Sequence, residues 1–146
     1  MAMADNRKAR YDYEVLETFE AGIELSGVET KSLRTNPASL DGAYVTVRGG
    51  EAFLMNMNIP PYQPSNTPAD YDPLRIRTLL LTKAEIRKLV NTESGQGLTI
   101  VPIKVYNKGT KIKVAVAIVR GKKQFDKRES IKKRETDREI RRTLKA

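Results

Sequence analysis

Residues 98–119 read LTIVPIKVYNKGTKIKVAVAIV, and this pattern indicates two strands joined by a short loop. Its two halves, 98–106 and 111–119, are rich in β-branched residues, which favour strands. The residues between them, 107–110, include a glycine and predict a hairpin loop. In the second half an apolar side chain stands at every other position, as in a strand with one buried face, at Ile112, Val114, Val116 and Ile118. The stretch therefore predicts an antiparallel β-hairpin.

A second hairpin is predicted closer to the N-terminus. The strand-like runs 43–48 and 51–57 are separated by Gly49-Gly50. Both central positions of the favoured two-residue hairpin turn need a positive φ, which glycine adopts readily.

Two further segments of the body can be interpreted from their residue types. Apolar and acidic residues alternate from Tyr11, which predicts a strand that runs to Phe19. Residues 60–68 contain four prolines. Because proline lacks an N–H donor and has a fixed φ, this segment cannot be a central strand or a helix, and we expect a long exposed loop.

Two helices are expected. Thr82-Lys83-Ala84-Glu85 has the pattern of a capping box with Thr82 as the N-cap, and apolar residues follow at helical spacing at Ile86, Leu89 and Val90. Residues 28–34 predict a shorter helix, which Asn36-Pro37 would end. Several short antiparallel strands with few helices favour an all-β class with helical decoration, a small antiparallel barrel.

The positive charge of the chain is concentrated after the predicted barrel, which we place at residues 1–121. The whole chain has a net charge of +9. Residues 120–146 hold 12 lysines and arginines and 5 acidic residues, whereas the other residues hold 15 and 13. A basic segment binds a phosphate backbone favourably because binding releases counterions, which favours a nucleic-acid partner. An anionic membrane is the competing partner, but the segment lacks the aromatic or leucine-rich face of an interfacial helix, so we expect no membrane association.

The segment 122–146 is too poor in apolar residues to order itself. Its larger apolar side chains are Phe125, Ile131, Ile140 and Leu144. Burying each contributes about 2 kcal/mol, whereas ordering the backbone costs roughly 1–2 kcal/mol for every residue of the segment. We expect a basic C-terminal tail that is disordered alone and that could become helical against a partner.

The residue types argue against an enzyme. Cysteine and histidine are absent, which excludes disulfides and thiolate metal sites and removes the commonest general base near neutral pH. We expect no catalytic residues, no metal and no cofactor. A nuclease that uses Asp41, Asp70 or Asp72 with Mg²⁺ is the enzymatic alternative, although aspartates near prolines more often begin turns. No apolar run approaches the roughly 18 residues of a membrane span, and residues 1–10 lack the apolar stretch of a signal peptide, so we expect a cytoplasmic protein.

Several short blocks along the chain carry a family resemblance. They are NRKAR at 6–10, FEAGI at 19–23, GVETKSLR at 27–34, DP at 72–73 with LLL at 79–81, and GKKQFDKR at 121–128. In this order they resemble the motifs of the SsrA-binding protein family, also called small protein B. Because the blocks are spread over most of the chain, the resemblance is far more specific than any one of them.

The resemblance implies a fold and a function. The family fold is an OB-type barrel with flanking short helices. Its body binds the tRNA-like domain of transfer-messenger RNA and delivers that RNA to the A site of stalled ribosomes for trans-translation, alongside elongation factor Tu with the aminoacylated RNA. The tail would enter the empty mRNA channel at the decoding centre of the small subunit and fold there as a helix.

The resemblance also implies RNA-binding residues in the body, namely Asn6, Arg7, Lys8, Arg10, Glu20, Leu80 and Thr82. A carboxylate such as Glu20 can accept hydrogen bonds from a guanine edge or a ribose hydroxyl, and a solvated charge at a strand end is the alternative. Asn6 suits a nucleotide contact, or lies in a disordered terminus. Leu80 faces RNA if its two leucine neighbours point inward, or else all three are core residues. Thr82 stands where relatives have an amide that contacts RNA, and the three cations contact phosphates or only add solubility.

In and beside the tail, the resemblance implies ribosome-binding residues, namely Gly121, Lys122, Lys123, Phe125, Asp126, Lys127, Arg128, Lys132, Lys133 and Arg134. The cations would contact phosphates, and Phe125 could stack on a ribosomal base in place of the histidine of some members. Asp126 would orient its basic neighbours or cap a helix. The alternatives are a generic basic tail and, for the whole protein, a general single-strand-binding OB module, whose face usually displays several exposed aromatic residues.

Overall fold

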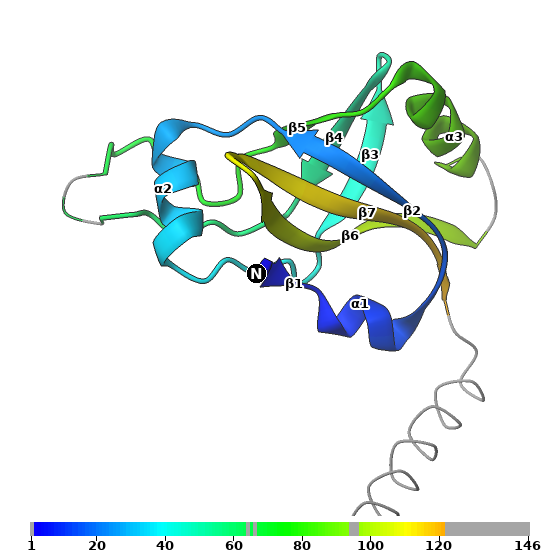
Figure 1. Ribbon diagram of the computed structural model, residues 1–146, viewed down its shortest axis with the longest axis horizontal. Coiled ribbons are helices and arrows are strands. Elements are labelled where there is room, and N and C mark those ends of the chain that lie inside the picture. Colours follow the sequence, from blue (N-terminus) through cyan, green and yellow to red (C-terminus); the bar gives the residue numbers. More distant parts are fainter. Residues whose placement is uncertain (1, 64, 66, 94–96, 122–146) are drawn as a thin grey trace, which may run out of the picture.

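One curved antiparallel sheet forms the body of the chain (Figure 1). The computed structural model describes residues 2–121 except 64, 66 and 94–96. Within these residues the sheet has seven strands in the order β1-β6-β7-β2-β5-β4-β3, and every neighbouring pair is antiparallel. The elements along the chain are β1 (Ala2–Asp5), α1 (Arg7–Asp12), β2 (Tyr13–Ile23), α2 (Gly27–Thr35), β3 (Tyr44–Arg48), β4 (Glu51–Met55), β5 (Arg77–Leu80), α3 (Lys83–Glu93), β6 (Leu98–Lys108) and β7 (Lys111–Gly121). The predicted all-β class with short helices is confirmed.

Both predicted hairpins are present. β3 and β4 are joined by Gly49 and Gly50, whose φ angles of 59° and 78° are the positive values that the turn requires. β6 and β7 pair through Lys108 and Lys111, so the loop between them is two residues shorter than the four predicted. Gly109, with a φ of 64°, makes this tight turn possible.

The prediction of a strand from residue 11 to 19 is wrong in its first part. Residues 7–12 form α1, because the side chain of Asn6 caps this helix, and β2 begins only at Tyr13. The alternation that suggested a strand does not mark a buried face, since Val15 is exposed and a bulge shifts the register between Val15 and Glu17. The edge strand β1 was not predicted at all.

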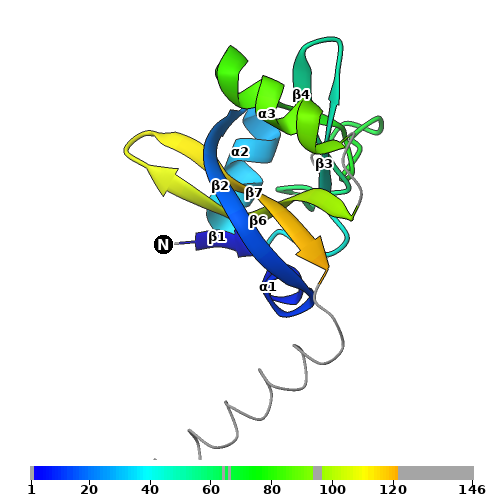
Figure 2. The ribbon, with the colours of Figure 1, turned by 90° about the vertical axis from the view of Figure 1, so that its right-hand side faces the viewer.

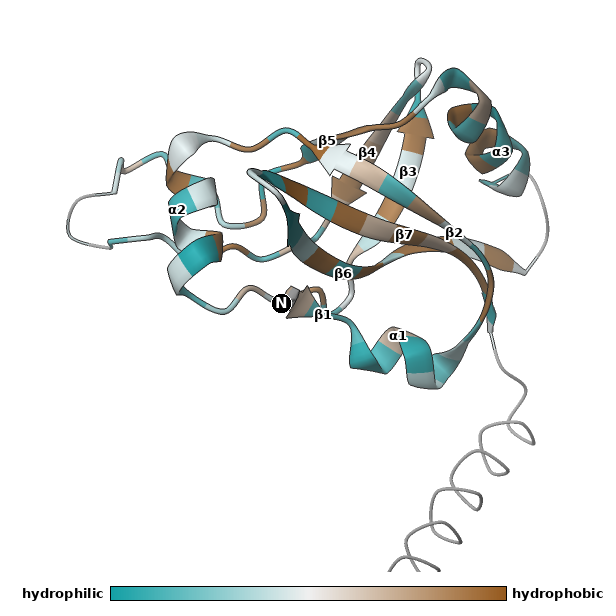
Figure 3. Ribbon diagram, in the orientation of Figure 1, coloured by the Kyte–Doolittle hydropathy of each residue, from teal (hydrophilic) through white to brown (hydrophobic). Residues whose placement is uncertain are grey.

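The core lies on both sides of the β6–β7 hairpin. The predicted inward face of β7, with Val114 and Val116 at its centre, joins the main core with residues from the other six strands and from α2 and α3. A second, smaller cluster lies beneath α1, where Ala9 packs with Ala117 and Val119 of β7. Figure 3 shows α1 as largely hydrophilic, as expected for a helix that buries only one narrow stripe. The single-faced pattern predicted for β7 is therefore correct but incomplete.

The two longer helices begin with reciprocal caps. Thr82 accepts from the backbone N–H of Glu85 at 3.2 Å and donates its own N–H to the Glu85 carboxylate at 2.9 Å, so the predicted capping box is confirmed. Ser26 and Glu29 form the same arrangement at α2, and this helix ends at Asn36 as expected. Figure 1 places α2 and α3 at opposite ends of the long axis of the body.

The sheet curls on itself. β1 and β3 are its two edges, and β3 comes close to β6 near the opposite edge. Figure 2 shows α3 and α1 at opposite ends of this curled sheet.

Closure into a barrel of the OB type stays a prediction, as does the boundary at residue 121. The predicted tail, 122–146, lies outside the described residues. Among the helices of the described part, none combines the length and apolar character needed to cross a membrane.

A buried ion pair holds the long connection between β4 and β5. The side chain of Arg77 is 0% exposed and that of Glu29 is 1% exposed, and they lie 2.6 Å apart. Arg77 also donates to the backbone carbonyls of Met57 and Pro73, which lie at the two ends of this connection. The hydroxyl of Ser32 donates to the carbonyl of Pro60 at 2.5 Å. The block 27–34, which forms most of α2, thus anchors the connection between β4 and β5 to that helix. The sequence did not reveal this structural role.

Candidate nucleic-acid interface

Three of the predicted RNA-binding residues line one open depression, which we call the Glu20 depression. It is formed by Glu20 of β2, Leu80 of β5, Thr82 at the start of α3 and Lys113 of β7, with neighbouring residues of the same elements and of β4. The register of the strands explains why these residues lie together, because Gly22 of β2 pairs with Leu80 of β5 on one side and with Lys113 of β7 on the other. Side chains of paired residues share a face, and Glu20, two residues from Gly22, shares it as well.

Gly22 leaves room for Leu80. A Cβ at Gly22 would lie 3.2 Å from the Cβ of Leu80, closer than most such contacts. Leu80 is 55% exposed whereas Leu79 is 2% exposed and Leu81 is partly buried. The expected outward direction of Leu80, with its neighbours turned inward, is confirmed. A contact with RNA stays a prediction.

Glu20 is an exposed carboxylate held by two donors. The hydroxyl of Tyr106 donates to Oε2 at 2.6 Å, and the ammonium of Lys108 donates to Oε1 at 2.9 Å. These hydrogen bonds, from Tyr106 first and Lys108 second, lower the pKa of Glu20 below its ordinary value. Burial and the neighbouring Glu20 raise the pKa of Tyr106 to about 12. At neutral pH the carboxylate is therefore an acceptor and the tyrosine a donor.

Thr82 lines the depression at the start of α3. Its hydroxyl is the acceptor of the α3 cap, so its oxygen is already engaged by the N–H of Glu85. The hydroxyl can still donate, since a threonine has one O–H besides its lone pairs. The predicted RNA contact of Thr82 stays a prediction.

The α1 residues lie on a different surface. Asn6 is 4% exposed, and its amide donates to the carbonyl of Pro102 at 2.9 Å while its oxygen accepts from the N–H of Ala9 at 3.1 Å. The alternative of a disordered terminal residue is therefore wrong, and the polar atoms of Asn6 face the protein. Arg7 and Lys8 are exposed, and Arg10 pairs with Asp5 at 3.4 Å.

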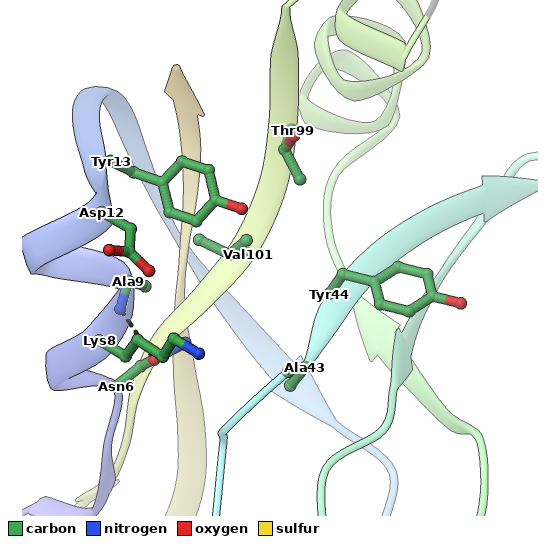
Figure 4. Close-up of a pocket in the computed structure, with 10 residues that line it drawn as sticks. Asn6, Lys8, Ala9, Asp12, Tyr13, Ala43, Tyr44, Thr99 and Val101 are labelled. Atoms are coloured by element: carbon green, nitrogen blue, oxygen red, sulfur yellow. Dashed lines mark hydrogen bonds between the residues drawn. The ribbon is translucent and has the colours of Figure 1, made fainter. Parts of the chain in front are cut away.

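A groove between α1 and the start of β3 contains one of these cations. Lys8 lies there with Tyr13 and Tyr44, as Figure 4 shows, and this groove shares no lining residue with the Glu20 depression. The structure therefore divides the predicted RNA-binding residues between two surfaces. Tyr44 was not singled out from the sequence. Two residues before Tyr44, Gly42 adopts a positive φ of 74° in the turn that precedes β3.

The predicted ribosome-binding residues fall almost entirely outside the described residues. Gly121 is the last residue of β7, where it is exposed and pairs with Tyr13. The other nine, from Lys122 to Arg134, lie in the segment that the structure does not describe.

The three aspartates of the nuclease alternative do not form one metal-binding group in the described part of the chain. In the described part of the chain, no three His, Cys, Asp or Glu side chains form a group suited to a metal ion. Asp72 accepts from the backbone N–H of Leu74 at 2.9 Å, which is the turn role expected of it.

Comparison with known proteins places the whole chain in one family. A family model described as SmpB protein matches residues 3–146. An SsrA-binding protein of Nostoc punctiforme is 48% identical over 144 residues, which cover 99% of this chain and 93% of the relative. That of Enterococcus faecalis is 48% identical over 98% of this chain and 92% of the relative. A chain from the solved structure "tmRNA-SmpB: a journey to the center of the bacterial ribosome" has a TM-score of 0.68 and 43% identity, with 87% of this chain and 92% of that chain covered. The protein described here belongs to the SmpB family, whose curated relatives are SsrA-binding proteins.

Proposed function

We propose that this protein binds transfer-messenger RNA and acts in trans-translation on stalled ribosomes. The observation that carries this proposal is the 48% identity to SsrA-binding proteins over almost the full length of both chains. The similarity to a chain solved in a tmRNA–SmpB structure of the ribosome supports the same partners. In this proposal the protein acts by binding, in the cytoplasm, and has no catalytic step of its own.

The Glu20 depression is the proposed contact with the tRNA-like domain of that RNA. It combines an ionised acceptor at Glu20, an exposed apolar side chain at Leu80 and a cation at Lys113. A carboxylate selects N–H or ribose O–H donors, a leucine packs on a base or sugar, and an ammonium neutralises a phosphate. Together these groups suit a folded RNA surface better than a single-stranded one, because among the described residues no aromatic side chain lines the depression.

The α1 cations form a second proposed contact. Arg7, Lys8 and Arg10 project from a helix whose position depends on Asn6. We assign phosphate contacts to the three cations. Asn6 itself supports binding by anchoring α1, since its side chain is turned toward Pro102 and Ala9.

The ribosomal part of the proposal rests on the basic segment at the end of the chain. Twelve basic and five acidic residues between 120 and 146 favour phosphate contacts along a ribosomal channel. We assign to this segment entry into the empty mRNA channel near the decoding centre. Delivery to the A site alongside elongation factor Tu completes the proposed cycle.

Filter binding with transcribed tRNA-like domain tests the RNA-binding part. We expect nanomolar affinity at low salt that falls by roughly a thousandfold between about 50 and 200 mM salt, as for some six phosphate contacts. Oligo-U is the matched competitor without folded structure, and it should displace little RNA at equal concentration. Binding that ignores salt, or displacement by oligo-U at equal concentration, would count against the proposal.

A further inference from the structure

Tyr106 supports the carboxylate of Glu20 from the neighbouring part of the sheet. Its hydroxyl lies 2.6 Å from Oε2 of Glu20, the short distance of a hydrogen bond to an ionised acceptor. Tyr106 is on β6 and partly buried, and the ammonium of Lys104 lies 5.2 Å from the centre of its ring. The hydroxyl of Tyr106 is therefore directed at Glu20 by a partly buried ring.

The other donor to Glu20 is a weaker constraint. The side chain of Lys108 is 63% exposed and that of Glu20 is 40% exposed, so their ion pair is screened by salt and ordered at an entropic cost. Lys113 of β7 acts on Glu20 through its charge, and the charged residues Glu24, Glu51 and Glu85 line the same depression. Among these groups only Tyr106 is a neutral donor on a partly buried side chain.

A carboxylate has about four lone-pair sites, and Tyr106 and Lys108 occupy one on each oxygen of Glu20. An RNA donor must approach one of the free sites, and its hydrogen bond depends on how the carboxylate is turned. A free glutamate on a surface would lose its rotational freedom on binding, which weakens association. A carboxylate already turned by the protein avoids this loss.

We propose that Tyr106 is a positioning residue, which fixes the orientation of the Glu20 carboxylate so that RNA donors meet an acceptor that is already turned toward them. This inference rests on the proposed function. Lys108 is the exchangeable partner, which can leave Glu20 for a phosphate when RNA arrives. The lowered pKa of Glu20 is consistent with this division, because the hydrogen bond from Tyr106 is its largest cause.

The test begins with Tyr106→Phe, which removes one hydroxyl and keeps the ring. In the free full-length protein, carbon-detected NMR titration of Glu20 should show a higher pKa in this variant than in wild type, at low and at high salt. Lys108→Gln should raise the pKa at low salt only, because the ion pair is already screened at high salt. Tyr62→Phe, a hydroxyl deletion in the proline-rich connection, is the matched control and should leave the titration of Glu20 unchanged.

RNA binding gives the second readout. At pH 7 we expect Tyr106→Phe to bind the tRNA-like domain roughly 5- to 20-fold more weakly than wild type, as for loss of one hydrogen bond to a charged group. Since the pKa of Glu20 is raised in the variant, its affinity should also begin to fall at a higher pH on acidification. In a Glu20→Gln background the same tyrosine substitution should have no further effect.

The outcomes separate the inference from the proposed function. If wild type does not bind the RNA, the proposed function is wrong, and the titrations still decide whether Tyr106 controls the carboxylate. If Glu20 titrates alike in wild type and Tyr106→Phe, or if this variant binds RNA as tightly as Tyr62→Phe, the inference is wrong. An equal loss of affinity from Tyr106→Phe with and without Glu20 would show a general structural role instead, and would also overturn it.

Discussion

Arg77 is the residue on which the connection between β4 and β5 depends most. Its guanidinium reaches the buried carboxylate of Glu29 and the carbonyls of Met57 and Pro73, so one side chain joins α2 to both ends of that connection. Arginine suits this role because its planar fork donates in several directions at once. Among the described residues, every buried side-chain N or O atom has a hydrogen-bond partner.

Replacing Arg77 should be strongly destabilising. Arg77→Met keeps much of the volume but leaves the Glu29 carboxylate and two carbonyls without their buried donor. We expect a loss of about 3–5 kcal/mol in the free energy of unfolding, measured by urea denaturation. Arg75→Met is the control, because Arg75 contacts the same carboxylate from a half-exposed position and should cost about 1 kcal/mol or less. Equal effects of the two variants would contradict this account.

The stability of the protein should depend on the charge of Glu29 in acid. Burial raises the pKa of this carboxyl, but hydrogen bonds from Arg75, Ser26 and Arg77 outweigh burial and leave the pKa below its ordinary value of 4.5. Because the pKa of Glu29 is lower in the folded state, its ionised carboxyl stabilises the fold fully at pH values above the ordinary pKa. This contribution is lost as the pH falls through the folded-state pKa. Urea denaturation between pH 6 and pH 2 should show a steeper acid loss in wild type than in Glu29→Gln. Parallel curves would mean that Glu29 does not carry this dependence.

At the scale of elements, α1 is the part of the fold that local sequence described least well. The helix has only six residues and no stability of its own, so it exists because Asn6 caps it and Ala9 is covered by β7. The Asn6 amide also ties the helix to the bulged part of β6 at Pro102. The alternating residues 11–15 are compatible with a strand, but β2 begins only at Tyr13, and tertiary contacts override that preference at residues 11 and 12.

Asn6→Ala tests this anchoring. The substitution removes the cap of α1 and leaves the buried carbonyl of Pro102 without a donor, which should cost about 1–2 kcal/mol. Urea denaturation measures the cost, and hydrogen exchange of the β1 amides should become faster. Arg7→Ala, an exposed neighbour, should change the free energy of unfolding by less than about 0.5 kcal/mol. An Asn6→Ala protein with wild-type stability but weaker RNA binding would show that Asn6 contacts RNA directly.

At the scale of the whole molecule, charge is divided between two parts. Residues 1–119 have nearly balanced charge, and most of the net charge of +9 lies in 120–146. The two surfaces proposed to contact RNA, the Glu20 depression and the α1 groove, are lined by residues of the body. We therefore expect that recognition of a folded RNA and attachment to a ribosome can be separated.

Deleting residues 122–146 should separate them. We expect affinity for the isolated tRNA-like domain at moderate salt to stay within a few-fold of wild type, because the proposed contact lies in the body. Rescue of stalled ribosomes in a reconstituted translation system should be lost. A control chain with the seven basic residues from 122 to 134 changed to glutamine keeps the length and should also lose rescue. A large loss of affinity for the free RNA would contradict the division.

Short-range chemistry explains which parts of this fold could be predicted. The Gly49-Gly50 turn, the end of α2 at Asn36 and the Thr82 capping box each depend on residues within four positions of one another. β1 and β5 were missed because each is four residues long and is a strand only through its partners. For the site, the outward direction of Leu80 was predicted, whereas the inward direction of Asn6 was not.

The residue pattern was sufficient for the all-β class, the two hairpins, the concentration of charge near the end and, through its motifs, the family. The folded structure alone determined which distant groups meet, such as Glu29 with Arg77 and Glu20 with Tyr106, which are 48 and 86 residues apart. The physical reason is that a turn or cap is an interaction between neighbours along the chain. A contact across a sheet depends instead on the register of several strands and on bulges, which no local pattern specifies.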